Sequence, residues 1–496
     1  MLGSEMLYTA QQTRALDHCA IHQQGIPGIT LMSRAARAAF DSLLELWPQP
    51  GPLQVLCGTG NNGGDGFLIA DLAHKRGIAV TVLQLGDAQK IGGDALRARQ
   101  QALANGVEFR AFEGAALRTD GVIVDAMLGT GLGGEVRGVY REAIEAVNAA
   151  TVAGAAVLAV DIPSGLCADT GRVLGAAVRA DLTVTFIGMK RGLFTLDAAD
   201  HTGAIQFNDL GVGPEVYAQV AGDCQRLELE SLLQRLPARP ASAHKGLYGS
   251  VLVVGGDYGM AGAAALAAEA ALRCGAGLVR AATRAEHVAA LVARTPEVMA
   301  HGVSSGPELA PLIESSEVLV VGPGLGQSPW SEQMLQAAAA SGKPLVLDAD
   351  GLNMLAAGRA IAAQRRDNWV LTPHPGEAGR LLHTASAEVQ AERFAAARAL
   401  WQRYGGAVVL KGSGSLIAGD GQLLLSDYGN PGMASGGMGD VLSGVIGALL
   451  AQHVPLPEAA ALGVCLHGAA ADAAAQQGQR GLAATDLMPQ LRALLG

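Results

Sequence analysis

Aromatic and charged side chains are scarce in this chain of 496 residues, of which 4% are Phe, Trp or Tyr and 16% are charged. Half of the residues are hydrophobic and 67 are glycine, so the core has to be built mainly from Ala, Val and Leu. This composition, with its many glycine turns, favours layered α/β structure. A chain of this length exceeds one hydrophobic core, and we expect two domains of similar size.

The sequence also lacks a basic segment. Its formal net charge is -10 and its pI is about 5.6, and no run of Lys and Arg with interleaved aromatic residues occurs. Such a chain repels a polyphosphate backbone, so we expect no nucleic-acid partner.

The cysteines form no pattern that indicates a disulfide framework or a zinc site. There is no C-x-x-C pair and no ligand spacing to His. We therefore expect reduced and mostly buried thiols. The six positions are Cys19, Cys57, Cys167, Cys224, Cys274 and Cys465.

Long apolar runs are absent as well. The N-terminal sequence MLGSEMLYTAQQTRALDH lacks the basic start and apolar stretch of a signal peptide. The longest apolar stretches, such as Val445 to Leu450, are much shorter than the roughly 18 to 20 residues that span a bilayer. We expect a cytoplasmic protein without a membrane partner.

Short β-branched runs alternate with Ala- and Leu-rich segments of helical period from about residue 50 onward. In the first half, the predicted strands are LQVLCG, AVTVLQLG, GVIVDAMLG, AAVLAVDIPSG and LTVTFIGMKRG. This β-α-β order predicts a Rossmann-like, doubly wound sheet with helices on both faces. Ligands of such sheets bind at the carboxyl ends of the strands.

The alternation of predicted strands and helices is interrupted between Ala221 and Pro240, and a second α/β series begins with SVLVVGGD. We therefore place one domain at residues 1–222 and another at residues 223–496. Further strands are predicted at GLVRAAT, VLVVGPGLG, PLVLDADGLN, WVLTPHPGE and AVVLKGSGS. Ala-rich segments near 262–274, 334–341 and 457–475 predict packed helices, and no internal repeat relates the two halves.

The first half carries a glycine motif, CGTGNNGGDGF, directly after a strand and before a helix. Gly58, Gly60 and Gly63 stand in G-x-G-x-x-G order, which lets backbone N–H groups approach a pyrophosphate. An ordinary dehydrogenase would also use Asp87, near the end of the next strand, to bind a ribose.

Amide and carboxylate side chains inside the same motif need another explanation. We interpret Asn61, Asn62 and Asp65 as loop residues that supply oxygen ligands beyond what a pyrophosphate turn requires. Together with Asp125 and Ser164 at neighbouring strand ends, they suit a hard cation.

The segments GTGNNGGDG, DAMLGTGLGGEVRG and VDIPSGL, in this order, resemble the NAD(P)H-hydrate epimerase family over about residues 8 to 215. The resemblance implies that Asp161 is the acid-base group and that Asn62, Asp125 and Ser164 hold potassium. The implied contacts to the hydrated dinucleotide are Asn61, Asn62, Gly63, Gly64, Asp65, Gly129, Thr130, Gly131, Leu132, Gly133, Gly134, Glu135 and Asp161.

Epimerisation of a hydroxyl-bearing carbon beside a ring nitrogen needs a group that both takes and gives a proton. A carboxylate at a strand end, such as Asp161, can be tuned for this role. The structural alternative is that Asp161 only caps the following turn. Lys190, in FIGMKRG, either assists or orients a phosphate, or is a solvated lysine.

In the second half, NPGMASGGMGDVLSGVIGALLAQ predicts a glycine-rich turn that opens an apolar helix with Asp440 in its first turn. Free N–H groups there can hold a phosphoryl group while the carboxylate accepts a proton from an attacking hydroxyl. The turn resembles the Gly-x-Gly-Asp anion hole of the ribokinase-like superfamily, which implies a ribokinase-like α/β domain. A helix cap without chemistry is the alternative for Asp440.

Four further segments, GMAGAAALAAEAALRCGAGLV, VGPGLG, TPHPGEAGRLL and LKGSGSLI, resemble the NAD(P)H-hydrate dehydratase family over about residues 240 to 490. The implied dinucleotide contacts are Ala263, Gly324, Gly326, His374 and Asp440. The implied contacts to the adenosine nucleotide are Lys411, Gly412, Ser413, Gly414, Ser415 and Gly439. His374 lies between two prolines in a rigid loop, which favours a functional role for it.

The two resemblances imply a bifunctional isomerase and lyase that epimerises R and S NADHX or NADPHX and dehydrates the S form. ADP would phosphorylate the ring hydroxyl with Asp440 as base, and loss of phosphate would give NADH or NADPH, AMP and phosphate. Mg²⁺ normally accompanies such phosphoryl transfer. The preference for ADP over ATP is implied by the resemblance to bacterial members alone.

Two other functions are compatible with parts of the sequence. A vitamin or sugar kinase fused to a dinucleotide-binding module would share the GGMGD turn, but it would leave the NNGGD and PHPGE loops without a purpose. A non-catalytic nucleotide-binding scaffold would keep its affinity when Asp440 is replaced by Ala. A weakly apolar helical surface is compatible with a homo-oligomer.

Overall fold

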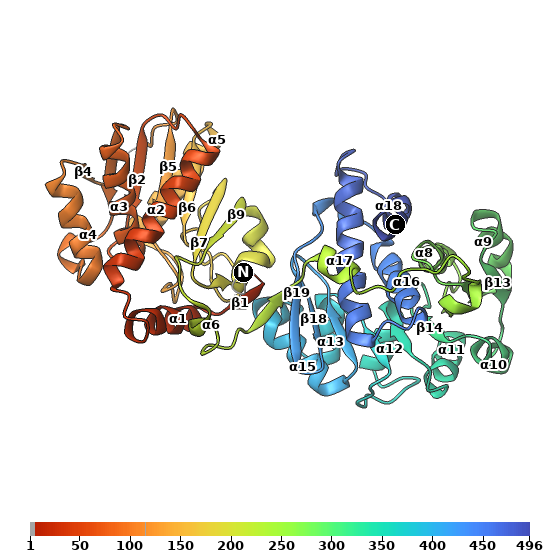
Figure 1. Cartoon of the computed structure of the whole chain (residues 1–496). Coiled ribbons are helices and arrows are strands. Elements are labelled where there is room, and N and C mark those ends of the chain that lie inside the picture. Colours follow the sequence, from red (N-terminus) through yellow and green to blue (C-terminus); the bar gives the residue numbers. More distant parts are fainter. Residues whose placement is uncertain (1–4, 115) are drawn as a thin grey trace. The chain divides into compact units, whose positions relative to one another are not determined.

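The computed structural model describes residues 5–114 and 116–496. The chain divides into two compact units, one that ends at Gln225 and one that begins at Arg226. Each unit has its own sheet and its own helices (Figure 1).

The first unit contains a parallel sheet in the order β4-β3-β2-β5-β6-β7-β9. Its strands are β2 (Leu53–Cys57), β3 (Val80–Gln84), β4 (Glu108–Ala111), β5 (Val122–Ala126), β6 (Ala156–Val160), β7 (Leu182–Phe186) and β9 (Ala204–Asn208). The five predicted strands are confirmed. The chain extends from β2 in one direction and from β5 in the other, so the carboxyl ends of these neighbours form the topological switch point where doubly wound sheets bind ligands.

Helices cover both faces of this sheet, as predicted. Side chains of α1 to α4 pack on one face, and those of α5 pack on the other. The bounds are α1 (Ala10–His22), α2 (Gly28–Leu46), α3 (Asn61–Lys75), α4 (Gly93–Ala104), α5 (Gly138–Val152) and α6 (Pro214–Tyr217), with short 3-10 helices η1 (Ala88–Lys90), η2 (Arg191–Phe194) and η3 (Leu196–Asp200).

Three short strands lie outside the main sheet of the first unit: β1 (Met6–Tyr8), β8 (Met189–Lys190) and β10 (Cys224–Arg226). β1 pairs with β8 in parallel, with Tyr8 opposite Lys190, and its other edge pairs with β10. This pairing holds Met6–Tyr8 and α1 beside Lys190.

In the second unit the strand order is β13-β12-β11-β14-β15-β16-β17-β18-β19. The strands from β13 to β17 are parallel, and β18 and β19 add an antiparallel hairpin. The bounds are β11 (Ser250–Val254), β12 (Leu278–Thr283), β13 (Met299–Gly302), β14 (Val318–Val321), β15 (Leu345–Leu347), β16 (Trp369–Leu371), β17 (Ala407–Leu410), β18 (Ser415–Gly419) and β19 (Gln422–Ser426).

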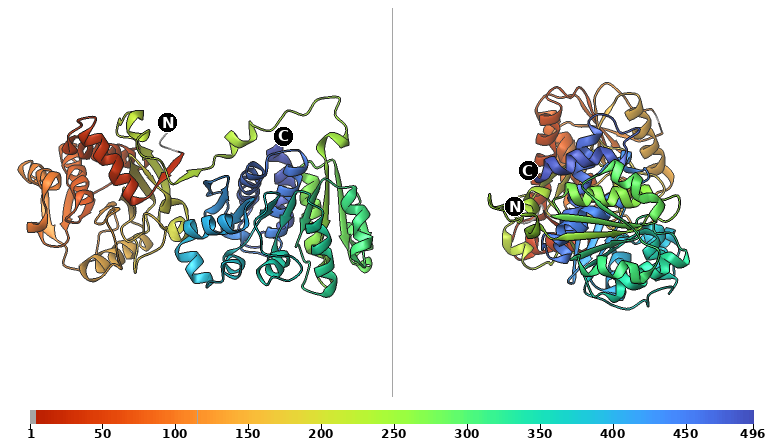
Figure 2. Two further views of the ribbon diagram at one scale, coloured as in Figure 1. Left: turned by 90° about the horizontal axis from the view of Figure 1, so that it is seen from below. Right: turned by 90° about the vertical axis from the view of Figure 1, so that its right-hand side faces the viewer.

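The sheet of the second unit also lies between helices (Figure 2, right). The larger helices are α8 (Ala261–Arg273), α10 (Gly306–Glu314), α11 (Pro329–Ala340), α12 (Ala349–Ala356), α13 (Pro375–Leu382), α15 (Arg393–Tyr404), α16 (Met438–Ala451), α17 (Leu456–Ala475) and α18 (Leu487–Leu495). The shorter ones are α7 (Leu229–Leu233), α9 (Val288–Arg294), α14 (Ser386–Ala391), η4 (Lys245–Tyr248), η5 (Ala285–His287), η6 (Pro431–Met433) and η7 (Ala484–Asp486).

The Ala-rich helices allow close packing without aromatic side chains. α8, α16, α17 and α18 share one core with the sheet. A Cβ on Gly444 of α16 would lie 2.1 Å from the carbonyl oxygen of Ala267 in α8, so the two backbones nearly touch. The prediction that the three Ala-rich segments form packed helices is confirmed.

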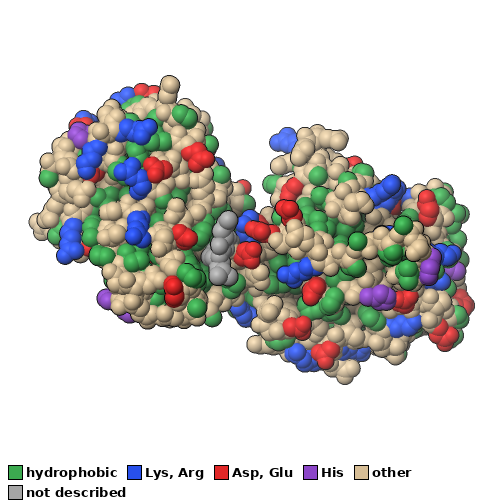
Figure 3. Space-filling view, in the orientation of Figure 1, with side chains coloured by type: hydrophobic (Ala, Val, Ile, Leu, Met, Phe, Trp, Pro, Cys, Tyr) green, Lys and Arg blue, Asp and Glu red, His purple; other side chains and the backbone are tan. Residues whose placement is uncertain are grey.

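The prediction that most of the cysteines are buried is also confirmed. All six cysteines are free thiols, and only Cys167 is not fully buried. No helix within the described ranges has the length and apolar character needed to cross a bilayer. On the face shown in Figure 3, acidic and basic side chains are interspersed over each unit rather than gathered into a field of one sign.

Candidate active sites

The glycine motif of the first unit brings the N-terminus of α3 close to two strand ends. A Cβ on Gly58 would lie 2.0 Å from the carbonyl oxygen of Met127, and one on Gly63 would lie 2.2 Å from that of Gly58. The interpretation of Asn61 to Asp65 as a loop is wrong, because α3 begins at Asn61 with Gly60 as its N-cap. The close approach explains why residues of low helix propensity are helical here, and it leaves the free N–H groups of the first turn at the switch point.

Asp125, Ser164 and Asn62 meet at this crevice. The buried Asp125 carboxylate accepts hydrogen bonds from the backbone N–H of Ser164 at 2.7 Å and from its hydroxyl at 2.5 Å. Asn62 donates from Nδ2 to the carbonyl oxygen of Leu128 at 3.2 Å, but its buried Oδ1 has no hydrogen-bond partner in the described structure. Burial raises the pKa of Asp125 to about 6, although the bonds from Ser164 oppose this.

These atoms fit the potassium ion that the family resemblance implies. An orphaned amide oxygen, a buried carboxylate and a hydroxyl are the hard oxygen donors that an alkali cation takes. A cation at this point would also offset the cost of burying the charge of Asp125. The donor set therefore supports the predicted ligands Asn62, Asp125 and Ser164.

Asp161 follows β6 in the left-handed backbone region, with φ of 68°. Its Oδ1 forms an ion pair with Lys190 and accepts hydrogen bonds from the Thr185 hydroxyl and the Phe186 N–H, both at 3.3 Å. Its side chain is 19% exposed, whereas that of Lys190 is fully buried. The contacts of Asp161 are thus with β7 and Lys190 rather than with the following turn, and Lys190 is not a solvated lysine.

Two further carboxyl groups lie in the field of Asp161 and Lys190. Burial and the charges of Asp161 and Asp17 raise the pKa of Asp65 well above its ordinary value, against the opposing effect of Lys190. Burial also raises the pKa of Asp17 to about 6. Asp17 was not predicted as a site residue; it lies on α1, four residues after the buried Thr13. The feature of the sequence that could have indicated Asp17 is an acidic residue near the packed face of a helix.

The second predicted dinucleotide loop, residues 129–135, begins beside the first. A Cβ on Gly129 would lie 3.4 Å from the Cβ of Asn62. Glu135, at the other end of the loop, is exposed and forms an ion pair with Arg137 at 2.9 Å. Asp87, the residue that a dehydrogenase would use on a ribose, instead accepts a hydrogen bond from the N–H of Gln89 and caps η1.

In the second unit, Asp440 is the third residue of α16, as predicted. Gly437 is the N-cap with φ of 93°, a conformation that favours glycine. Burial and the nearby charge of Asp348 raise the pKa of Asp440 to about 7, against the opposing effect of Lys411. The carboxyl group is therefore tuned to exchange a proton near neutral pH, beside a helix N-terminus that attracts anions.

Lys411 is the centre of the charged cluster around Asp440. Its Nζ donates to Asp348 Oδ1 at 2.9 Å and lies 4.0 Å from Glu377 Oε2. A Cβ on Gly439 would lie 3.3 Å from this Nζ, which places the ammonium next to the first turn of α16. Burial would lower the pKa of Lys411, but the charges of Asp348, Glu377 and Asp440 together raise it.

Asp348 and Glu377 were missed by the sequence analysis, although both lie in segments that it quoted. Asp348 follows β15 and is buried, and it also accepts a hydrogen bond from the Ser443 hydroxyl at 2.8 Å. Glu377 is buried at the third position of α13. Burial raises the pKa of Glu377, against the opposing effect of Lys411. The feature of the sequence that could have indicated Asp348 is the DAD sequence directly after the predicted strand.

The five residues predicted for substrate binding in this unit lie on loops and helix starts near strand ends. His374 caps α13, where its Nδ1 accepts a hydrogen bond from the N–H of Gly376 at 3.0 Å, and half of its side chain is exposed. A Cβ on Gly324 would lie 3.0 Å from the Cβ of Ala263, and Gly326 has φ of 68°. Ala263 lies in the first turn of α8.

The predicted nucleotide loop, residues 411–415, joins β17 to β18. Gly412 has φ of 146° and Gly414 has φ of 66°. The buried Arg393 stabilises the loop, because its Nη2 donates a hydrogen bond to the carbonyl oxygen of Gly414 at 3.0 Å. This arginine was not predicted, because nothing around it in the sequence of α15 distinguishes it from a surface residue.

In each unit, the groups at the carboxyl ends of the strands thus resemble the site of an enzyme that acts on nucleotides. The first offers helix N–H groups, a cation-type donor set and a carboxylate paired with a buried lysine. The second offers a glycine-rich helix N-terminus, a lysine and a carboxyl group with a pKa near 7. The fold and the site of the second unit define the ribokinase-like class, which transfers phosphoryl groups to hydroxyls.

Comparisons with known proteins agree with both units. A family model described as NAD(P)H-hydrate dehydratase matches residues 251–492, and one described as YjeF-related protein N-terminus matches residues 28–192. A bifunctional NAD(P)H-hydrate repair enzyme of Coxiella burnetii is 47% identical over 492 residues, which cover 99% of each chain.

Solved structures match the second unit. A ribokinase-like superfamily protein of Enterococcus faecalis is 29% identical, with a TM-score of 0.51, and the match covers 55% of this chain and 95% of that one. An ADP/ATP-dependent NAD(P)H-hydrate dehydratase of Bacillus subtilis, co-crystallised with ATP and Mg²⁺, is also 29% identical, with a TM-score of 0.48 and coverage of 54% and 96%.

The chain belongs to the family of bifunctional NAD(P)H-hydrate repair enzymes. It joins an epimerase with a nucleotide-dependent NAD(P)H-hydrate dehydratase, so the predicted family, fold class and function are confirmed. A dehydrogenase, a vitamin or sugar kinase and a non-catalytic scaffold are accordingly ruled out as its main role.

Proposed function

We propose that the first unit interconverts the R and S epimers of NADHX and NADPHX, and that the second dehydrates the S epimer with ADP as phosphoryl donor. The proposed domains are residues 1–222 and 223–496. The observation that carries this proposal is the position of Asp440, with a pKa of about 7, in the first turn of α16 and in the electrostatic field of Lys411.

In the dehydratase, Asp440 takes the proton of the ring hydroxyl as its oxygen attacks the β-phosphorus of ADP, and AMP leaves. The N–H groups around Gly439 and the ammonium of Lys411 stabilise the charge on the transferred phosphoryl group. The lone pair of the ring nitrogen then expels phosphate, the neighbouring carbon loses a proton and the reduced nicotinamide is restored. Ala263, Gly324, Gly326 and His374 bind the hydrated dinucleotide, and Lys411, Gly412, Ser413, Gly414, Ser415 and Gly439 bind the nucleotide.

Mg²⁺ enters this reaction with ADP, as part of the substrate. No group of three or more His, Cys, Asp or Glu suited to a metal occurs in the described part of the chain. Mg²⁺ is often held by substrate phosphates with one or two carboxylates, so a dedicated cage is not required.

In the epimerase, Asp161 exchanges a proton with the hydrated ring. Its Oδ1 is held by Lys190, Thr185 and Phe186, which leaves Oδ2 for the substrate. The N–H groups of Asn61 to Asp65 and the loop Gly129 to Glu135 hold the dinucleotide phosphates. A potassium ion held by Asn62, Asp125 and Ser164 would supply a fixed positive charge at the crevice.

We propose that the enzyme works in the cytoplasm, because its six thiols are free and five of them are buried. We propose neither a nucleic-acid partner nor a membrane partner.

Phosphorus NMR during turnover of the S epimer with ADP and Mg²⁺ tests the dehydratase chemistry. We expect AMP and inorganic phosphate to appear in equal amounts with NADH. Accumulation of a stable phosphorylated alcohol would contradict the proposal, because it would show that the site stops at the kinase step.

A further inference from the structure

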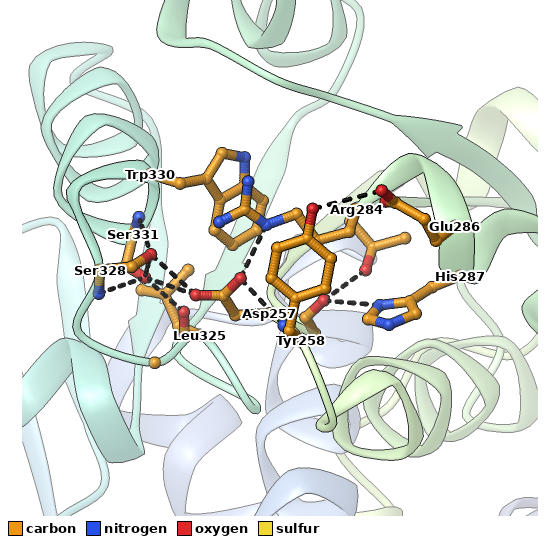
Figure 4. A network of polar contacts seen from close by, with 12 residues as sticks. Asp257, Tyr258, Arg284, Glu286, His287, Leu325, Ser328, Trp330 and Ser331 are labelled. Atoms are coloured by element: carbon orange, nitrogen blue, oxygen red, sulfur yellow. Dashed lines mark hydrogen bonds and ion pairs between the residues drawn. The ribbon is translucent and has the colours of Figure 1, made fainter.

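An arginine held between two aromatic rings lies beside the dehydratase site, and neither the family resemblance nor the proposed mechanism uses it. Arg284 follows β12, and its guanidinium lies 4.6 Å from the ring centre of Tyr258 and 4.4 Å from that of Trp330. Figure 4 shows the guanidinium between these two rings. Such stacking fixes the plane of the guanidinium and leaves its edge available for hydrogen bonds.

The guanidinium is tied to the protein through one nitrogen. Arg284 Nε donates to Asp257 Oδ1 at 2.7 Å, and the Arg284 side chain is 18% exposed. In the part of the chain that the structure describes, neither terminal nitrogen donates a hydrogen bond to a protein group. The free edge therefore presents a fork of N–H donors in the geometry that accepts a phosphate or carboxylate through two bonds.

Asp257 holds this arginine in place and is itself held by Ser328. It follows β11, receives Arg284 from the end of β12, and accepts a hydrogen bond from the Ser328 hydroxyl, before α11, at 2.7 Å. The pKa of Asp257 is lowered because the bonds from Arg284 and Ser328 outweigh the effect of burial. The carboxylate stays ionised, and its position is set from both sides (Figure 4).

The network also touches the proposed substrate loops. A Cβ on Gly326 would lie 3.0 Å from Asp257 Oδ2, and the N–H of Asp257 donates to the carbonyl oxygen of Gly324 at 2.7 Å. Arg284 is therefore one residue away from the loop that is proposed to hold the hydrated ring.

Strand order gives the direction in which the dinucleotide extends. The neighbouring strands run β12-β11-β14-β15-β16-β17, with Arg284 after β12, Asp348 after β15 and Lys411 after β17. The ADP loop follows β17, so the side of the sheet that leads over β14 and β11 to β12 is left for the rest of the dinucleotide. Three strand spacings of about 4.8 Å give roughly 14 Å from β15 to β12, a distance within reach of the phosphates of a dinucleotide whose ring is at Asp440.

We infer that Arg284 binds a phosphate group of the hydrated dinucleotide in the dehydratase site, with Asp257 as its positioning residue. This inference rests on the proposed function of the second unit. The phosphate is either the pyrophosphate, which NADHX and NADPHX share, or the 2′-phosphate, which only NADPHX carries.

Steady-state kinetics of Arg284→Gln with both substrates, at saturating ADP and Mg²⁺, tests the inference. Loss of a charge-assisted hydrogen bond is expected to raise KM for the dinucleotide about tenfold or more, with kcat and KM for ADP within about twofold of wild type. If KM rises for both NADHX and NADPHX, Arg284 binds the pyrophosphate. If KM rises for NADPHX alone, Arg284 binds the 2′-phosphate. Unchanged KM for both substrates, or a fall in kcat alone, overturns the inference.

Arg280→Gln is the matched control, since Arg280 lies on β12, the strand that Arg284 follows, and the substitution removes the same charge. It should leave both KM values unchanged. Arg284→Lys keeps the charge but loses the fork, so it should lie between wild type and Arg284→Gln, and it replaces that variant if the glutamine form does not fold. Asp257→Asn should raise the same KM, and its combination with Arg284→Gln should be less than additive.

A calorimetric titration of the full chain with NADPH distinguishes a failure of this inference from a failure of the proposed function. NADPH carries both kinds of phosphate and requires no turnover. Arg284→Gln should weaken one class of binding site while Arg280→Gln weakens none. If wild type binds NADPH in this way but does not dehydrate NADPHX, the proposed function fails and the inference stands. If wild type and Arg284→Gln bind and react alike, the inference alone fails.

Discussion

The two active sites use the same part of an α/β sheet with opposite electrostatic arrangements. Around Asp161 in the first unit, Asp17 and Asp65 have raised pKa values, and Lys190 is the buried cation that opposes them. Around Asp440 in the second unit, Lys411 is held by two acidic side chains beside a helix N-terminus. The first arrangement suits proton exchange on a ring, and the second suits transfer of an anionic group.

The largest effect should come from Asp440→Asn. Removal of a general base costs about 10²–10⁴-fold in rate, so dehydration should fall by about that factor. Epimerisation in the same chain should keep its wild-type rate, which is the internal control. Both rates are followed with purified R and S epimers, and an equal loss of both would contradict the separation of the two sites.

Asp161→Asn should give the reverse pattern. Epimerisation should fall by about 10²-fold or more, because the amide neither takes nor gives a proton, while dehydration of the pure S epimer should stay at the wild-type rate. Exchange of the epimers is measured by chromatography in the absence of ADP. The matched control is Asp87→Asn, a strand-end aspartate that only caps η1 and should change neither rate.

These sites show how much the sequence predicts. Strand ends followed by glycine located Asp125 and Asp161, because parallel strands end at one edge of a sheet. A glycine-rich turn before an apolar helix located Asp440. The sequence analysis missed Asp17, Asp348 and Arg393, whose roles depend on packing between distant elements: β1 pairing with β8, α16 packing beside β15, and α15 lying under the β17–β18 loop. It also did not predict the helical start at Asn61, which follows from the close approach of Gly58 and Gly63.

Removal of potassium should have a smaller effect than the two aspartate substitutions, and it should affect the first site alone. Replacing K⁺ by choline should slow epimerisation by about tenfold and leave dehydration unchanged, because Asn62 and Asp125 belong to the first site only. Asn62→Ala should lower the epimerisation rate in K⁺ and make it insensitive to choline. Equal sensitivity of both reactions to K⁺ would contradict the assignment of these ligands.

The smallest expected effect concerns stability. The pKa of Asp440 is about 7 in the folded chain against an ordinary value of 3.8, so its ionisation opposes folding. The stability that this group contributes is fully present below about pH 3.8 and is lost as the pH rises through about 7. Asp440→Asn should therefore raise Tm by about 2 °C or more at pH 8 and by less at pH 5, as measured by calorimetry. A lower Tm at pH 8 would contradict the pKa assignment.

The most direct test of the account is the recovery of reduced-nicotinamide absorbance from a mixture of both NADHX epimers with ADP, Mg²⁺ and K⁺. Wild type should convert the whole mixture, and Asp161→Asn should stop, on the same time scale, at the fraction present as the S epimer. Full and equally fast conversion by Asp161→Asn, or no recovery with wild type, would contradict the claim that the chain carries two separate sites for one repair reaction.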